Sequence, residues 1–73
     1  MQDPPSQRLW RLRKLHQSAD VHLHRTPQGR FELRFLYNGE PAYARQCGTY
    51  EEALAEAAEK RAELEREGWT AHW

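Results

Sequence analysis

Alternating basic and aromatic residues in the middle of the chain form the pattern in this sequence that is best suited to chemistry. Arg30, Glu32 and Arg34 lie two positions apart, and His22 and His24 show the same spacing a few residues earlier. Side chains two positions apart lie on one face of a β-strand. Because arginine pairs with phosphate and hydrogen-bonds to guanine edges, such a face favours nucleic-acid binding. One alternative is a solvated polar face, which is normal for an antiparallel sheet covered on one side. Another is that the N-terminal segment docks on this face and buries Leu36 under Leu9, Trp10 and Leu12.

Metal binding and catalysis are both poorly supported by the motifs present. The pair His22 and His24 has Cys47 as a further candidate ligand, whereas a zinc site needs about four ligands in a tetrahedral array. The chain contains no G-x-S-x-G elbow, no P-loop and no G-x-G-x-x-G motif. A domain this small also has little room for a concave pocket. We therefore expect a non-enzymatic protein with no cofactor, no metal and no small-molecule substrate.

The environment of Cys47 leaves two alternatives. The residue comes directly before Gly48 and the start of a predicted helix, where the pKa of a thiol can be lowered. Its alternation with Tyr43 and Arg45 instead directs it toward the helix side of the sheet, where a buried and inert thiol is the commoner outcome. As the single cysteine of the chain it cannot form an internal disulfide, which favours a reducing compartment.

Length and charge indicate one small domain. The chain has 73 residues and a formal net charge of zero, which suffices for one domain. Residues 1–38 hold seven Lys/Arg and three acids, a net charge of +4, while residues 39–73 hold four Lys/Arg and eight Glu, a net charge of −4. This asymmetry fits a polyanion-binding surface backed by an acidic one, or a dipole that has no partner. Because no apolar run approaches the ~20 residues that span a bilayer, we expect a cytoplasmic protein without membrane contact.

Residues 1–18 are predicted to form a basic N-terminal segment outside the main domain. Residues 1–7 are polar, contain paired prolines and favour disorder. Leu9, Leu12 and Leu15 then recur at helical spacing, which predicts a short amphipathic helix or, alternatively, a flexible arm. The basic residues that would contact phosphate in this segment are Arg8, Arg11, Arg13 and Lys14.

Residues 19–73 are predicted to form a single domain that begins with a three-stranded antiparallel meander. The strands are expected at residues 21–25, 31–37 and 40–47. Turn chemistry separates them at residues 26–29 and again at Asn38-Gly39, a pair that favours a two-residue type I′ hairpin. Strict alternation in the third strand points Arg45 toward the helix. A bulge at Arg45 is the alternative, and it would place Arg45 instead of Gln46 on the open face.

A C-terminal helix is predicted to begin after Thr49. Thr49 as N-cap and Glu52 three residues later form a capping box. Gly68 suits the helix end in a Schellman motif, with Trp69 packing back on Leu64. The stripe expected against the sheet contains Tyr50, Leu54, Ala57, Arg61 and Leu64, widened by Ala53 and Ala58. The predicted fold is therefore α+β, a three-stranded antiparallel β-meander packed on one C-terminal α-helix.

From Gly29 to Leu64 the layout resembles the AP2-type DNA-binding domain and its relatives at the N-termini of tyrosine recombinases. The resemblance rests on the run Gly29-Arg30-Phe31-Glu32-Leu33-Arg34-Phe35, on the hairpin after it, and on Gly48-Thr49-Tyr50-Glu51-Glu52-Ala53 entering an alanine-rich helix. It implies a helix on one sheet face and an opposite face that enters the DNA major groove. The positions implied to face the groove are His22, His24, Glu32, Arg34, Ala44 and Gln46, with histidines where the family has arginines on its first strand.

The chain is also similar to short bacterial proteins of unknown function that end in a Glu/Arg/Ala-rich helix followed by Gly-Trp. That similarity implies no activity. Two hypotheses follow from the sequence. The first is a small module that binds double-stranded DNA through the open sheet face, using His22, His24, Arg30, Glu32, Arg34 and Gln46 together with the basic N-terminal segment. The alternative is a protein-interaction module, or a homodimer formed through an edge strand or through exposed aromatic residues, for which the candidates are Trp10, Trp69 and Trp73.

Overall fold

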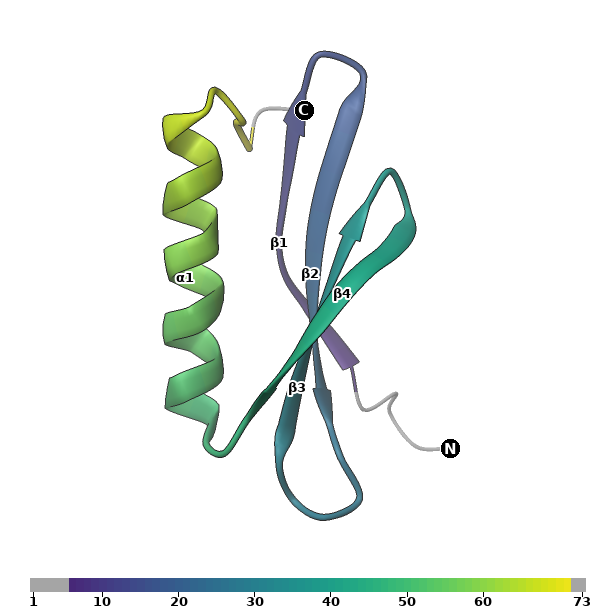
Figure 1. Ribbon diagram of the computed structural model, residues 1–73, viewed down its shortest axis with the longest axis vertical. Helices are drawn as coiled ribbons and strands as arrows, with labels where there is room; N and C mark the ends of the chain where they lie inside the picture. Colours follow the sequence, from purple (N-terminus) through teal and green to yellow (C-terminus); the bar gives the residue numbers. More distant parts are fainter. Residues whose placement is uncertain (1–5, 72–73) are drawn as a thin grey trace.

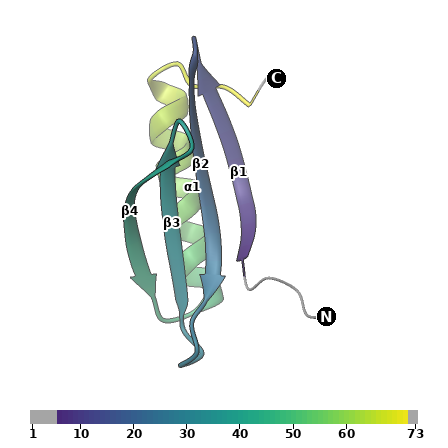
Figure 2. The same ribbon diagram turned by 90° about the vertical axis from the view of Figure 1, so that its right-hand side faces the viewer.

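One antiparallel sheet with a helix against one of its faces makes up residues 6–71, which are the residues that this computed structural model describes. The elements are β1 (Ser6–Lys14), β2 (Gln17–Arg25), β3 (Phe31–Tyr37), β4 (Glu40–Cys47) and α1 (Tyr50–Arg66). The strands lie in the order β1-β2-β3-β4, and α1 runs along one face of the sheet (Figure 1; Figure 2). The α+β class and the C-terminal helix are confirmed, but the sheet has four strands rather than the three predicted.

The basic segment near the N-terminus is a strand, and neither a helix nor a flexible arm. β1 pairs antiparallel with β2 along its length. A β-bulge adds Leu9 between Arg8 and Trp10 in the register, and this extra residue shifts the apolar pattern toward a helical spacing. Beyond the bulge, Trp10 and Leu12 alternate at the period of a strand and are both buried. Leu15 lies in the tight turn into β2, with a φ of +57°. The prediction of disorder for residues 1–7 is wrong at Ser6 and Gln7, which begin β1 and pair with β2. Residues 1–5 fall outside the described residues.

Two turns predicted from the sequence set the register of the other strands. In the β2–β3 turn, the amide of Gly29 donates to the carbonyl of Thr26 at 2.9 Å, and Gly29 has a φ of +82°. Glycine reaches this left-handed conformation without a steric penalty. In the β3–β4 hairpin, Asn38 and Gly39 have φ values of +54° and +81°, as a type I′ turn requires. Both turn predictions are confirmed.

β4 keeps a strict alternation around Arg45, and its bulge lies closer to the hairpin. The extra residue in the β3–β4 register is Ala42. Arg45 lies on the helix side, where its Nη2 atom is 3.0 Å from Glu56 Oε2 of α1. The sheet rim therefore accommodates this arginine by pairing its charged end with the helix. The alternative of a bulge at Arg45 is wrong, and Gln46 stays on the open face.

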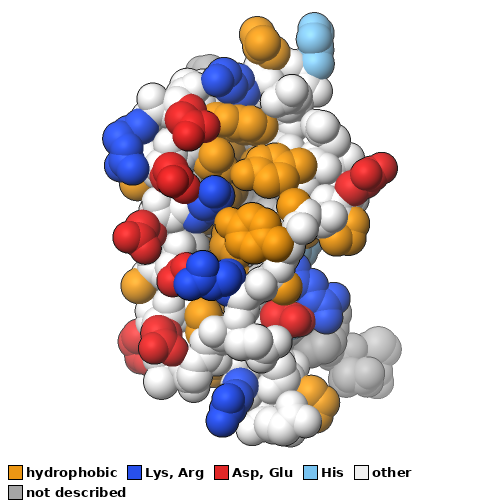
Figure 3. Space-filling view, in the orientation of Figure 1, with side chains coloured by type: hydrophobic (Ala, Val, Ile, Leu, Met, Phe, Trp, Pro, Cys, Tyr) orange, Lys and Arg blue, Asp and Glu red, His pale blue; other side chains and the backbone are white. Residues whose placement is uncertain are grey.

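Both ends of α1 carry the predicted caps. The amide of Glu52 donates to Thr49 Oγ1 at 3.0 Å, and the Glu52 carboxylate accepts from the amide of Gly48 at 2.8 Å. At the other end, Gly68 has a φ of +99° and the amide of Trp69 donates to the carbonyl of Leu64 at 3.1 Å. The exposed side of the helix carries charged side chains of both signs (Figure 3).

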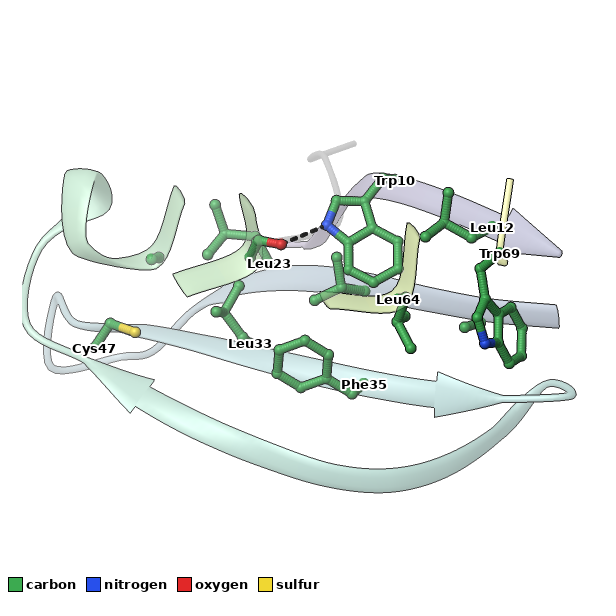
Figure 4. Packing of buried hydrophobic residues seen from close by; sticks show 12 residues of the cluster. Trp10, Leu12, Leu23, Leu33, Phe35, Cys47, Leu64 and Trp69 are labelled. Atoms are coloured by element: carbon green, nitrogen blue, oxygen red, sulfur yellow. Dashed lines mark hydrogen bonds between the residues drawn. The ribbon is translucent and has the colours of Figure 1, made fainter. Parts of the chain in front are cut away.

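The core lies between α1 and the helix-facing side of the sheet (Figure 4). Its buried residues are Trp10, Leu12, Ala19, Val21, Leu23, Leu33, Phe35, Cys47, Ala53, Ala57, Leu64 and Trp69. Helix α1 turns Ala53, Ala57 and Leu64 toward the sheet, and the small alanine side chains permit close approach. Tyr50 and Leu54 belong to the predicted stripe but are 41% and 37% exposed, because the helix is rotated toward its alanines.

Trp10 joins the first strand to the helix. Its indole Nε1 donates a buried hydrogen bond to the carbonyl of Ala57 at 2.9 Å (Figure 4). A buried tryptophan usually needs such a partner for its N–H group. Lys14, also on β1, donates from Nζ to the carbonyl of Glu67 at 2.7 Å. This cation lies at the C-terminal end of α1, where the helix dipole favours positive charge.

Trp10→Phe should lower the free energy of unfolding by about 2 kcal/mol, because it removes the hydrogen bond to Ala57 and part of a buried ring. Trp69→Phe is a matched control: Trp69 is also 8% exposed, and its indole makes no hydrogen bond among the described residues. The control should cost about 1 kcal/mol less. Urea unfolding followed by circular dichroism measures both values. Equal losses would mean that the hydrogen bond contributes nothing.

Candidate nucleic-acid interface

The sheet face opposite α1 is polar, and it collects most of the residues predicted to bind nucleic acid. The strand register arranges its side chains in rows across the sheet. The central row contains Arg8, His22, Arg34 and Ala44. The row on the side of the β1–β2 turn contains Arg11, Asp20, Leu36 and Pro41. The row on the other side contains His24, Glu32 and Gln46.

β1 supplies the largest share of the positive charge on this open face. Arg11 and Arg13 alternate with the buried Trp10 and Leu12, so both belong to the solvent side of the strand. Arg8 lies beyond the Leu9 bulge and pairs with His22, which places it on the same side. Adjacent strands lie ~4.8 Å apart, which puts the Cα atoms of Arg8 and Arg34 about 10 Å apart with His22 between them. The arginines assigned to a separate basic segment and those assigned to the sheet therefore form one surface.

Asp20 is the acidic centre of the β1–β2 part of this face. Its carboxylate lies 3.8 Å from Arg8 Nη1 and 3.5 Å from Arg11 Nε. His22 Nε2 is 3.9 Å from the same group. The arginine side chains remain about half-exposed, whereas Asp20 is largely covered. Sequence reasoning missed this residue, although its position directly before the His-x-His pair on one strand face is a signal that could have identified it.

Glu32 organises the β3–β4 part of the open face. Arg34 Nε donates to Glu32 Oε1 at 2.8 Å, and Gln46 Nε2 donates to Glu32 Oε2 at 3.2 Å. The carboxylate thus holds both neighbours in defined orientations. Within residues 6–71, the two Nη groups of Arg34 form no hydrogen bond, so they remain available to a ligand.

The fold lowers the pKa of His24 on β2. Burial lowers its pKa below the usual 6.5, and the Arg34 guanidinium lowers it further, against an opposing effect of Glu32. The ring centroid of His24 lies 6.5 Å from that of His22 on the same strand. His24 therefore favours its neutral form, in which one ring nitrogen donates and the other accepts a hydrogen bond.

A shallow apolar hollow of about 170 Å³ opens on this face. It is lined by His22, His24, Arg34, Leu36 and Pro41. Leu36 and Pro41 are paired across β3 and β4, so the hollow has an apolar floor beside a guanidinium group. Leu36 follows Arg34 at the spacing of one strand face and was expected on that face, but neither Leu36 nor Pro41 was among the predicted site residues.

Two of the predicted basic residues lie away from the open face. Lys14 follows the buried Leu12 on the helix side of β1, and its ammonium group binds the end of α1. Arg30 lies in the β2–β3 turn, where its amide donates to Thr26 Oγ1 at 3.0 Å. Lys14 thus makes a structural contact with α1, and Arg30 lies outside the three rows of the open face, in the turn.

The aromatic residues predicted for a protein interface do not form an exposed group. Trp10 and Trp69 are both buried in the core, and Trp73 lies outside the described residues. Tyr43 is the more accessible aromatic residue: it is 43% exposed and stacks on Phe35 with ring centroids 4.6 Å apart. Both residues line a cleft of about 330 Å³ between β4 and α1, visible as apolar side chains flanked by charged ones (Figure 3).

Cys47 is buried, and burial raises the pKa of its thiol, with further contributions from Glu56 and Glu52. This agrees with the inert alternative, because the thiolate is the reactive form. Among residues 6–71, no group of three or more His, Cys, Asp or Glu side chains could hold a metal ion. The same range contains no helix with the length and apolar character needed to cross a bilayer.

Charge on the two sides of the molecule is opposite in sign. On the open face, four arginines stand against Asp20 and Glu32, a net charge of +2 with neutral histidines. Residues 50–67, which contain α1, hold seven Glu and three Lys/Arg, a net charge of −4. The uneven charge along the sequence therefore becomes a separation between the sheet face and the helix.

No family model matches the chain, and neither a curated protein nor a solved structure matches it. These comparisons therefore give no information on the resemblance to AP2-type domains.

The stability of the protein should fall as the pH drops from 7 to 5, in part because of His24. The unfolded chain binds a proton to this residue near pH 6.5, whereas the folded chain binds it at a lower pH. The stabilisation is complete above pH 6.5 and is lost as the pH falls through the folded pKa. His24→Gln should show a smaller loss over this range, measured by urea unfolding at several pH values. Parallel profiles for parent and variant would contradict the lowered pKa.

Proposed function

We propose that this protein binds double-stranded DNA through the open face of its sheet. The observation that carries the proposal is the row of Arg8, His22 and Arg34 across three adjacent strands, with Arg11 and Arg13 beside it. A two-stranded β-ribbon fits the major groove of B-DNA. Protein–DNA recognition combines phosphate contacts that position the protein with base contacts that specify sequence. The open face offers side chains for both tasks.

Arg8, Arg11 and Arg13 on β1 are the phosphate-binding residues in this proposal. β1 is an edge strand, so its arginines lie at the rim of the face and can reach the backbone that borders the groove. The ion pairs of Arg8 and Arg11 with Asp20 are long, at 3.8 and 3.5 Å, and involve half-exposed side chains. Pairs of this kind contribute only about 0–1 kcal/mol. Exchange of Asp20 for a phosphate therefore costs little, while Asp20 keeps the two guanidinium groups close to each other in the free protein.

Arg34 is the residue best placed to contact a base. Its Nε is held by Glu32, and Gln46 braces the same carboxylate, so the free Nη groups have a defined direction. An arginine fork of this kind matches the O6 and N7 acceptors of guanine. The hollow next to Arg34, with Leu36 and Pro41 on its floor, suits the methyl group of thymine. The resemblance to AP2-type domains implies the same face for DNA.

Helix α1 contributes to orientation rather than to contact. Its net negative charge is repelled by phosphate, so the protein meets the duplex with the sheet face forward. The neutral total charge also limits sequence-independent binding, which depends on phosphate neutralisation. We therefore expect binding that is moderate in strength and steeply weakened by salt.

Arg34→Ala should weaken binding to a fluorescein-labelled mixed-sequence duplex by about tenfold, measured by fluorescence anisotropy at low salt. Arg8→Ala should weaken binding as well, and it should reduce the slope of log affinity against log salt by about 0.9, the value for one lost phosphate contact. Both side chains are about half-exposed, so neither change should unfold the protein.

Arg61→Ala is the matched control for these two variants. It removes one positive charge from the helix side, where Arg61 pairs with Glu65 at 3.0 Å and is similarly exposed. The control should bind as well as the parent protein. Equal affinities for the parent and Arg34→Ala, or an equal loss in Arg61→Ala, would overturn the assignment of the open face.

A further inference from the structure

The two outer edges of the sheet differ in how they are closed. On β1, the amide of Arg13 donates to the carbonyl of Thr70 at 2.7 Å, and the amide of Thr70 donates back at 2.9 Å. The chain after α1 therefore pairs with the outer edge of β1. No described segment pairs with the outer edge of β4. An unpaired strand edge is a template for another strand.

The hairpin geometry identifies which backbone groups of β4 point outward. In the two-residue Asn38-Gly39 hairpin, the flanking residues Tyr37 and Glu40 face each other as a hydrogen-bonded pair. Alternation, with the Ala42 bulge included, then directs the hydrogen-bonding groups of Tyr43 toward β3. The amide and carbonyl groups of Ala44 and Gln46 consequently point away from β3, toward the open edge of the sheet.

Features near the hairpin restrict where a new strand can pair. Pro41 has no amide hydrogen to donate, and the bulge at Ala42 bends the strand next to it. A regular edge is thus left only from Tyr43 to Cys47. An edge this short permits few registers, so the side chains opposite one another decide which of them is favourable.

We propose that β4 pairs antiparallel with β4 of a second copy of this chain, with Ala44 opposite Ala44. In this register, Tyr43 on each strand lies opposite Arg45 on the other, on the helix side of the sheet. The Tyr43 ring is 43% exposed and has Lys60 Nζ 5.9 Å from its centroid, and the Arg45 side chain is 57% exposed while it pairs with Glu56. An arginine that also approaches this ring adds a cation–π contact. The neighbouring register, centred on Arg45, would place two arginines directly opposite each other and is disfavoured by their like charge. Of these two registers, the one centred on Ala44 avoids this repulsion.

The symmetry of this dimer has a definite consequence for the open face. Residues that lie opposite each other in an antiparallel pair point their side chains to the same side of the sheet. The two sheets therefore join into a single eight-stranded sheet, with both helices on one face. The two arginine-rich faces then form a continuous surface. The dimer does not depend on the proposed DNA binding, because it rests on the β4 edge and not on the arginine rows.

Sedimentation equilibrium over a range of protein concentrations tests this proposal. The parent chain should show a reversible monomer–dimer equilibrium. Ala44→Pro removes the central outward amide and should raise the dissociation constant by about thirtyfold or more. The variant should keep its fold, since this amide is not used by β3. Ala44→Val, which keeps the amide, is the matched control and should dimerise like the parent.

Amide hydrogen exchange of the parent chain provides a second measurement that needs no variant. Exchange at Ala44 should slow as the protein concentration rises, while exchange at residues of β2 stays constant. A chain that remains monomeric at high concentration would overturn the proposal. A dimer that persists in folded Ala44→Pro would overturn it as well and would move the interface elsewhere, for example to the Tyr43 cleft. Neither result depends on whether DNA is bound.

Discussion

The hydrogen bond from the Trp10 indole to the carbonyl of Ala57 is the interaction on which the rest of the structure depends, because it ties the first strand to the helix across 47 residues of chain. β1 is an edge strand of the described sheet, with β2 as its neighbouring strand. The indole fills the space between β1 and α1, and Lys14 adds a second contact at the end of the same helix. With both contacts present, the N-terminal segment becomes part of the core.

The same strand that closes the core also builds the candidate site. Trp10 and Leu12 point toward α1, so the alternation of a strand turns Arg11 and Arg13 toward solvent. A site on strands is held more rigidly than one on loops, since the position of each side chain is set by backbone hydrogen bonds and by burial of its neighbours. Asp20 and Glu32 complete this arrangement by orienting the arginines, and α1 keeps the negative charge on the other side of the sheet.

The sequence predicted the turns and helix ends of the fold, because each of these depends on a few adjacent residues. The Asn38-Gly39 turn, the Thr49 cap and the Gly68 helix end each depend on the conformational preferences of a few adjacent residues, and all three are present. β1 was not predictable in this way, because a bulge at Leu9 disguised its period and its partner strand is a property of the whole sheet. The same limit applies to the site. His22, His24 and Arg34 share a face by simple alternation, whereas the place of Arg8 beside them depends on the pairing of β1.

Chemical-shift mapping tests the central claim most directly, which is that the face built by β1, β2 and β3 is the DNA-binding surface. The isotope-labelled protein would be titrated with a mixed-sequence duplex at low and at moderate salt, and the amide spectrum recorded at each step. The account predicts shift changes concentrated in residues 8–13, 20–24 and 32–36, which decrease steeply as salt is added. A spectrum that DNA leaves unchanged at low salt, or changes confined to α1 and the Tyr43 cleft, would contradict it.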